Sequence, residues 1–266
     1  MIAAMLIVLI SWGVLFCVIA GLGQLAQKAL RLNILNTAGW FTAFWIGYAV
    51  VIAALECWHL ALPIDWHVCG VLCALGSIGF IWGLRQPRMH RISRLQAGLS
   101  NVALAPVAVW FVSRALDAQL DFDTGMYHLA SIRWLNEYPV VPGLGNLHYR
   151  LAFNQSFFSF VAALNVYPFF NEGLHVANGL LIIVLVAQLI STTIHALFRP
   201  GNITPYHVFS VLFLPIALYR ASHQIDSANM SSASPDLSVF VFQTVIILAF
   251  VKYLFTLNLA ESERKL

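Results

Sequence analysis

The segment DFDTGMYHLASIRW, residues 121–134, gathers ionisable side chains in a chain of which only 9% of residues are charged. Asp121 and Asp123 are candidate catalytic residues, because a carboxylate in an apolar cleft can act as a general base toward a hydroxyl or amine. In a turn, the two acids could instead converge on a divalent cation, with Mg²⁺ or Mn²⁺ as the candidate cofactor. The structural alternative has equal weight: Asp123 or Thr124 is a natural N-cap for the helix that follows.

A second set of side chains could bind an anionic substrate. Guanidinium groups hold phosphate through paired hydrogen bonds, and several arginines are expected on the same side of the membrane as the acids. The alternative is that these arginines pair with acids or with lipid headgroups. A loop histidine, in turn, is more often a structural hydrogen-bonding residue than a metal ligand. The candidate substrate-binding residues are Arg150, Arg220, Arg133, His128, Tyr127, His148 and Asn154, and His223 and Asp226 could complete the site.

The composition places these residues in a membrane protein. The mean hydropathy is +0.81 and 60% of the residues are hydrophobic, far from the balance of a soluble domain. The net charge of +3 is small and the basic residues are scattered, so we expect no nucleic-acid partner. The expected fold is an all-α, polytopic integral membrane protein, whose surroundings are the lipid bilayer.

A membrane-spanning helix needs roughly 20 mostly apolar residues. Such runs predict about seven transmembrane helices, near residues 2–22, 38–58, 67–84, 97–115, 174–197, 203–221 and 236–256. An eighth candidate, residues 151–170, carries several polar side chains and could span the bilayer or lie along its surface. No internal repeat is detectable, so residues 1–266 are expected to form a single transmembrane domain.

The charges predict the orientation of these helices. With seven spans and the N-terminus outside, most Lys and Arg residues fall on the cytoplasmic side, together with the C-terminus. The partly helical segment 116–173, which carries the acidic motif, then lies outside. A second polar loop, residues 221–236, faces the same compartment. Its last residues suit the start of the seventh span, which by itself would account for Asp236.

This arrangement resembles the GT-C superfamily, multi-span glycosyltransferases that use polyprenyl-phosphate-linked sugars and carry an acidic motif in an external loop. The resemblance rests on the DFD motif, Asp121 to Asp123, and on the aromatic helix after it. More narrowly, DTGMYHLASIRW followed by GLGNLHYRLAFNQSFF is similar to a pattern in uncharacterised bacterial membrane proteins related to that superfamily, over residues 121–158.

The resemblance implies sugar transfer from a lipid-linked phosphate donor at the outer face of the bacterial inner membrane, in cell-surface glycan synthesis. It implies Asp123 as the base or acceptor-orienting acid, Asp121 as a metal- or donor-positioning acid, and Arg150 or Arg220 for the donor phosphate. The chain departs from the superfamily because it has fewer spans and carries its motif after four of them. It is therefore expected to be the N-terminal part of a longer architecture, one half completed by a further membrane chain, or a degenerate relative of the superfamily.

Two other functions are compatible with the same sequence. In a transporter of lipid-linked or small polar substrates, the acids would form a proton or cation site, but the expected spans carry almost no ionisable residues near the middle of the membrane. In a non-catalytic assembly subunit, the external segment would be a docking surface. Replacing Asp123 separates these alternatives from catalysis.

Overall fold

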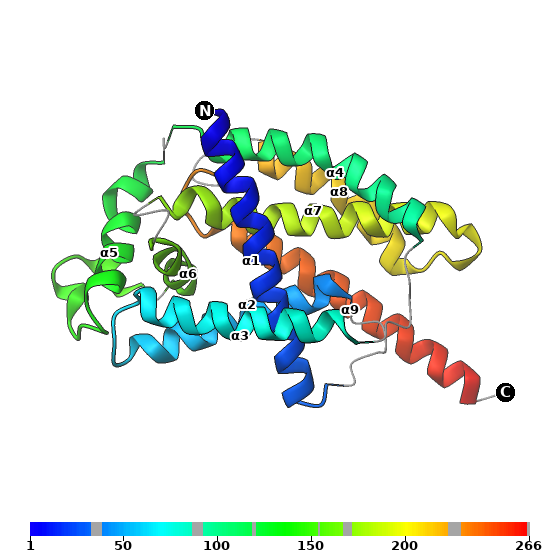
Figure 1. Ribbon diagram of the computed structural model, residues 1–266, viewed down its shortest axis with the longest axis horizontal. Coiled ribbons are helices and arrows are strands. Elements are labelled where there is room, and N and C mark those ends of the chain that lie inside the picture. Colours follow the sequence, from blue (N-terminus) through cyan, green and yellow to red (C-terminus); the bar gives the residue numbers. More distant parts are fainter. Residues whose placement is uncertain are drawn as a thin grey trace.

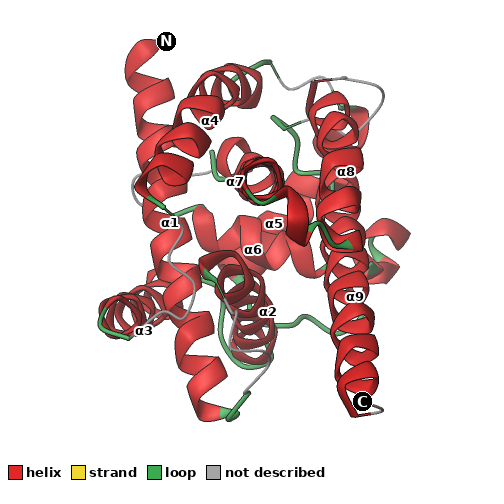
Figure 2. Cartoon of the chain, turned by 90° about the vertical axis from the view of Figure 1, so that its right-hand side faces the viewer, coloured by secondary structure: helices red, strands yellow, loops and turns green. Residues whose placement is uncertain are grey.

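The computed structural model describes residues 1–32, 39–86, 93–118, 121–153, 155–166, 172–222 and 230–264, without the side chains of residues 202 and 256–264. Every regular element in these ranges is a helix, as Figure 2 shows. The expected all-α architecture is therefore confirmed.

Nine α-helices and four shorter helical segments follow one another along the described chain. They are α1 (Ile2–Ala29), α2 (Trp40–His59), α3 (Trp66–Leu84), α4 (Arg94–Ala115), η1 (Thr124–His128), α5 (Leu129–Glu137), η2 (Leu144–Asn146), η3 (Tyr149–Ala152), α6 (Ser156–Leu164), α7 (Leu174–Phe198), η4 (Pro200–Asn202), α8 (Pro205–Ser222) and α9 (Asp236–Arg264). The expected external segment thus contains η1, α5, η2, η3 and α6, and is partly helical.

Six of the described helices, α1, α2, α3, α4, α7 and α9, are long and apolar enough to cross a membrane. The chain is a multi-pass membrane protein. The expected span at 203–221 forms the helix α8, but polar residues such as His207 and Arg220 leave its 18 residues less apolar than the other six. The eighth candidate does not form a span, because the nine residues of α6 rise only about 14 Å against a hydrocarbon core of about 30 Å.

The helix α7 forms the centre of the bundle. More than half of the residues in its apolar 18-residue stretch are buried inside the protein. This share is larger than in any of the other five candidate spans. The helices α1, α4, α8 and α9 all contact it, and Figure 2 shows it enclosed between them. From residue 174 to residue 190 its apolar residues are buried on nearly all sides, as expected of a helix surrounded by other helices.

The helix α1 crosses the bundle steeply and packs against α2 and α3 (Figures 1 and 2). Glycines allow this close crossing. A Cβ atom at Gly47 would lie 1.8 Å from the carbonyl oxygen of Ile19, and one at Gly21 would lie 1.9 Å from that of Gly76. The backbones approach each other too closely for any side chain, a type of contact common between membrane helices.

The short helices of the segment between α4 and α7 lie at one end of the molecule, at the left of Figure 1, whereas the C-terminus lies at the opposite end. Asn136 of α5 fastens them to the bundle. Its Nδ2 donates to the carbonyl oxygens of Ile64, at 2.7 Å, and Ala162, at 2.9 Å. This single side chain therefore joins α5 to α6 and to the connection between α2 and α3.

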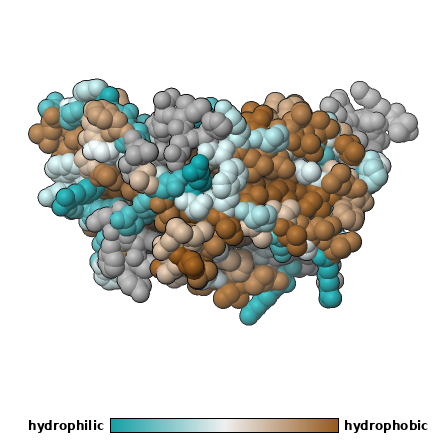
Figure 3. All heavy atoms as spheres, turned by 90° about the horizontal axis from the view of Figure 1, so that it is seen from above, coloured by the Kyte–Doolittle hydropathy of each residue, from teal (hydrophilic) through white to brown (hydrophobic). Residues whose placement is uncertain are grey.

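The surface also has a polar end and an apolar end along the line from α5 to the C-terminus (Figure 3). On the face drawn in Figure 3, hydrophobic side chains form a broad patch over the half farther from α5, and hydrophilic side chains gather mainly toward α5. Exposed apolar residues on α4 and α8, such as Val102 and Leu212, agree with contact to lipid. The polar end is the one that carries the acidic motif.

Candidate functional site

The first aspartate of the DFD motif begins the helical segment. Asp121 Oδ2 accepts a hydrogen bond from the backbone N–H of Thr124 at 3.0 Å, and a second from the Thr124 hydroxyl. A carboxylate that accepts from the N–H three residues later is an N-cap. The predicted caps, Asp123 or Thr124, were two or three positions late, and Asp123 makes no capping hydrogen bond.

The same hydroxyl connects Asp121 to a buried histidine. Thr124 Oγ1 lies 2.9 Å from His128 Nδ1, which is itself 3.6 Å from Asp121 Oδ2. Because the hydroxyl donates its one proton to the carboxylate, its oxygen can only accept from His128. Neutral His128 then carries its proton on Nδ1 and leaves Nε2 as an acceptor.

Burial favours this neutral form. The side chain of His128 is 2% exposed and that of Asp121 is 6% exposed. Burial lowers the pKa of His128 below its ordinary value, while the charges of Asp121, Asp123 and Asp236 oppose this effect. At neutral pH, His128 is therefore an uncharged hydrogen-bonding group.

The second aspartate points toward a different partner. Asp123 Oδ1 accepts a short hydrogen bond from Arg150 Nη1, and the two side chains form an ion pair. The Arg150 guanidinium also lies 5.0 Å from the centre of the Tyr127 ring, and its Nε donates to the Tyr149 hydroxyl at 3.0 Å. Asp123, Tyr127 and Arg150, all predicted site residues, are thus brought together.

A π-helical turn places these two sets of residues side by side. In η1, the N–H of Leu129 bonds to the carbonyl oxygen of Thr124, five residues back. Residues four apart share a helix face, so Thr124 aligns with His128 and Asp123 with Tyr127. Single π-helical turns are often found at functional sites.

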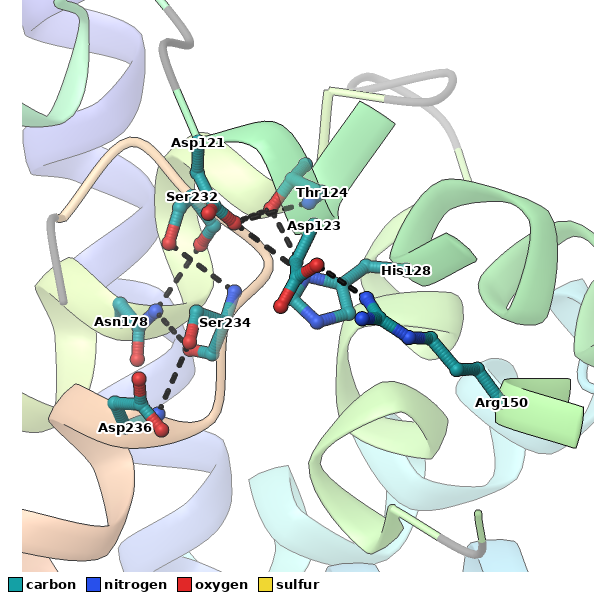
Figure 4. A network of polar contacts seen from close by, with 9 residues as sticks. All are labelled: Asp121, Asp123, Thr124, His128, Arg150, Asn178, Ser232, Ser234 and Asp236. Carbon is teal, nitrogen blue, oxygen red and sulfur yellow. Dashed lines mark hydrogen bonds and ion pairs between the residues drawn. The ribbon is translucent and has the colours of Figure 1, made fainter. Parts of the chain in front are cut away.

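The start of α9 forms the remaining wall of this cluster (Figure 4). Asn178 Nδ2 donates to the carbonyl oxygens of Ser232, at 3.0 Å, and Ser234, at 2.8 Å, and both serines are buried. Asp236 follows these serines in the chain, and its charge is one of those that oppose the lowering of the His128 pKa by burial. Asp236 also stands in the first turn of α9, where the helix dipole favours an acid, as predicted.

The other predicted arginines do not join the ion pair of Asp123. Arg133 is 79% exposed and pairs with Glu137 at 2.7 Å. The guanidinium of Arg220 lies 5.6 Å from the centre of the Phe240 ring, one helical turn after Asp236. For Arg133, the alternative of pairing with a nearby acid is the arrangement found.

The predicted loop residues are only partly placed. His148 Nδ1 accepts from the backbone N–H of Arg150 at 3.3 Å, and the His148 ring stacks on that of Tyr149. His148 therefore supports the turn that presents Arg150. Three other candidates lie outside the described residues: Asn154, His223 and Asp226.

The two carboxylates do not converge on a common point, since Asp121 bonds to Thr124 and Asp123 to Arg150. Within the described ranges, no group of three or more His, Cys, Asp or Glu side chains is placed to hold a metal ion. The arrangement is suited to binding an anion at Arg150 and accepting a proton at Asp123. A role for Mg²⁺ or Mn²⁺ stays a prediction.

Two residues of the cluster were missed from the sequence. Thr124 was considered only as a cap, although an Asp followed three residues later by Thr is a spacing that could have indicated their contact. Asp236 lies 115 positions after Asp121 in the chain, and no local pattern connects them.

Comparison with known proteins gives the family of the chain but no activity. No curated protein and no solved structure matches it. A family model described as "Domain of unknown function (DUF8201)" matches residues 5–261, and the chain therefore belongs to this family.

Proposed function

We propose that this protein is a membrane glycosyltransferase that takes its sugar from a lipid-phosphate-linked donor at the outer face of a bacterial inner membrane. The ion pair between Asp123 and Arg150, at the polar end of an otherwise apolar bundle, carries the proposal. In this pair a carboxylate, a group able to accept a proton, lies directly beside a guanidinium, a group able to bind phosphate. Sugar transfer from a lipid phosphate needs both groups at the membrane boundary.

In the proposed reaction, the donor phosphate replaces Asp123 as the partner of Arg150. Guanidinium binds phosphate through two parallel hydrogen bonds, so the exchange is favourable. The freed Asp123 carboxylate accepts the proton of an acceptor hydroxyl, whose oxygen forms a bond to the anomeric carbon. The bond from that carbon to the phosphate oxygen breaks, and the lipid phosphate leaves with the electron pair, held by Arg150.

The buried residues have a positioning role in this scheme. The hydrogen bonds from Asp121 through Thr124 to His128 fix the first turn of the segment that carries Asp123. The Tyr127 ring beneath Arg150 limits where the guanidinium can move. A rigid support of this kind keeps the reacting groups aligned without reorganisation.

The test compares two variants of the full chain in membranes from cells that lack the native copy. The donors are polyprenyl-phosphate glucose, galactose and mannose, each with a labelled sugar, and the measurement is labelled glycan. Asp123→Asn should lower product formation by about 10²–10⁴-fold, because it removes the base. The control is Glu137→Gln, which changes an exposed carboxylate of the same segment and should keep the activity of the native chain.

Product formation is compared at equal amounts of membrane-inserted protein. We expect both variants to insert as well as the native chain. If Asp123→Asn forms as much product as the native chain, the assignment of the base is wrong. If the native chain transfers none of the three sugars while Asp123→Asn still abolishes glycan in living cells, a binding or assembly role replaces transfer.

A further inference from the structure

An open cavity of about 610 Å³ lies beside the acidic cluster, lined by the end of α2, by α5, by the loop after α5 and by α6. This volume is within the usual range for small-molecule sites, about 300–1,000 Å³. Much of its lining is apolar and includes the rings of Trp134, Phe153 and Phe158. None of its polar groups belongs to the Asp123–Arg150 pair.

Polar side chains from α2, α5 and α6 line this cavity. Glu56 of α2 accepts a hydrogen bond from the Ser159 hydroxyl at 2.6 Å, and its carboxylate has further acceptor capacity. His59, which is 8% exposed, has no hydrogen-bond partner for Nδ1 among the described residues, and neither does Ser131 for its buried Oγ. Because an unpaired buried polar group is costly, these two atoms need a partner inside the cavity, which bound water or a ligand would supply.

The walls are tied together before any ligand binds. The backbone N–H of Val140 donates to the carbonyl oxygen of His59 at 3.0 Å, and that of Ile64 donates to Leu135 at 2.8 Å. Asn136 adds its two bonds to the neighbouring elements. The loop after α5 therefore cannot collapse into the space without breaking backbone hydrogen bonds.

The charge of the lining selects the chemistry of the ligand. Glu56 is the one acidic residue among the described lining residues, which include neither Lys nor Arg. A phosphate would meet repulsion there and find no cation. Hydroxyl groups suit the site, because they can donate to Glu56 and can either donate to or accept from His59 and Ser131. The aromatic rings can pack against the apolar face of a ring.

From these contacts we infer that the cavity binds a neutral sugar unit through Glu56, His59 and Ser131. It lies directly behind the acidic cluster, since the Phe158 ring is 5.1 Å from the His128 ring and the Phe153 ring is 6.5 Å from that of Tyr127. Sugar binding here does not depend on the proposed transfer reaction. It requires only the cavity and its polar groups.

The test is isothermal titration of the purified full chain in lipid nanodiscs. The probes are the methyl glycosides of glucose, galactose, mannose and N-acetylglucosamine, with glucose 1-phosphate and choline as charged comparisons. We expect saturable binding of at least one methyl glycoside. We expect Glu56→Gln to weaken it about tenfold or more, as for the loss of one charge-assisted hydrogen bond.

One further test variant and two controls accompany this measurement. Ser131→Ala removes a hydroxyl that has no partner in the described part of the chain, so it should weaken binding several-fold without affecting folding. Glu172→Gln changes a carboxylate that is 68% exposed and outside the cavity lining, and should leave binding unchanged. Asp123→Asn should also bind the glycoside normally, which separates this site from the proposed reaction.

The inference is overturned if no methyl glycoside binds saturably, or if glucose 1-phosphate or choline binds as tightly as the best glycoside. It is equally overturned if Glu56→Gln and Ser131→Ala, both folded by circular dichroism, bind the glycoside as the native chain does.

Discussion

Thr124 is the residue on which the buried part of the site depends. Its hydroxyl is the shared partner of Asp121 and His128, and its own side chain is fully buried. A hydroxyl can donate once and accept at the same time, so it joins a carboxylate to a neutral imidazole without an additional charge. No apolar side chain of the same shape can do this.

Thr124→Val should therefore destabilise the protein by about 1–3 kcal/mol, because Asp121 and His128 each lose a buried hydrogen-bond partner. Thr124→Ser keeps the hydroxyl and should recover most of the loss. The measurement is thermal unfolding in detergent, followed by circular dichroism. A valine variant as stable as the native chain would contradict the network.

His128 should also make stability depend on pH. A histidine in the unfolded chain titrates at about 6.5, and burial lowers the pKa of His128 in the folded state below this value. As the pH falls below about 6.5, the unfolded state takes up this proton first, so stability decreases down to the folded-state pKa. Above that range, His128 contributes no pH dependence.

His128→Gln removes this titration and should give a smaller loss of melting temperature between about pH 7 and about pH 5 than the native chain shows. The acids that surround the ring, Asp121, Asp123 and Asp236, are present in both proteins. The comparison therefore isolates the histidine. Parallel curves for the two proteins would mean that His128 is not held neutral by burial.

Much of this cluster could be predicted from residue types alone. The scarcity of charge in the chain drew attention to Asp121, Asp123, His128 and Arg150, and the structure brings these residues together. The division into two sets could not be predicted, because it depends on which aspartate caps the helix and on the π-helical turn. The cap depends on the hydrogen bond from the Thr124 N–H to Asp121, and the π-helical turn on that from the Leu129 N–H to the Thr124 carbonyl oxygen.

Among the helices, the crossing of α1 over α2 and α3 is the contact least tolerant of change. A Cβ atom at Gly23 would lie 1.8 Å from the carbonyl oxygen of Ala43, and one at Gly79 would lie 2.2 Å from that of Gly21. In each case the obstacle is backbone, which cannot rotate away as a side chain can. The glycines thus fix the distance between these helices.

Gly47→Leu should prevent this packing, at a cost of at least about 3 kcal/mol, because its Cβ would lie 1.8 Å from the Ile19 carbonyl oxygen. Gly13→Leu is the matched control in α1, since nothing lies within 4 Å of a Cβ at that position. The measurement is the yield of monodisperse protein after membrane extraction, together with its melting temperature. Equal values for the two variants would contradict the close crossing.

The helices themselves were largely predictable, because their apolar runs are long. The expected spans near 2–22 and 174–197 appear as α1 and α7, although α1 extends seven residues further. Residues 151–170 were harder to interpret, since an aromatic run such as SFFSF suits a span and a buried short helix equally. Its burial against α2, α5 and α7 decides the matter, and only tertiary contacts reveal it.

The molecule as a whole has two unlike ends. The acidic cluster, α5 and the cavity lie at one end, whereas Arg85, Arg94 and Arg199 flank the opposite ends of α3, α4 and α7. The 19 residues of α3 separate the two ends by about 28 Å, close to the thickness of the hydrocarbon core. The basic end is expected in the cytoplasm, which would place the site outside.

Single cysteines can test this orientation in intact cells. In a chain whose four native cysteines are replaced by serine, Tyr138→Cys introduces a thiol at the end of α5, and Gln86→Cys introduces one just after α3. Both native positions are exposed. A membrane-impermeant maleimide should label Tyr138→Cys in intact cells, but Gln86→Cys only after permeabilisation.

The two positions control for each other, because each variant should react fully once the membrane is opened. The reverse pattern would place the acidic cluster in the cytoplasm. The Arg150 side chain would then meet phosphates on the cytoplasmic side, and a donor presented at the outer face could not reach Asp123. Sugar binding in the cavity would survive that result, because it depends on Glu56, His59 and Ser131 and not on which side of the membrane they face.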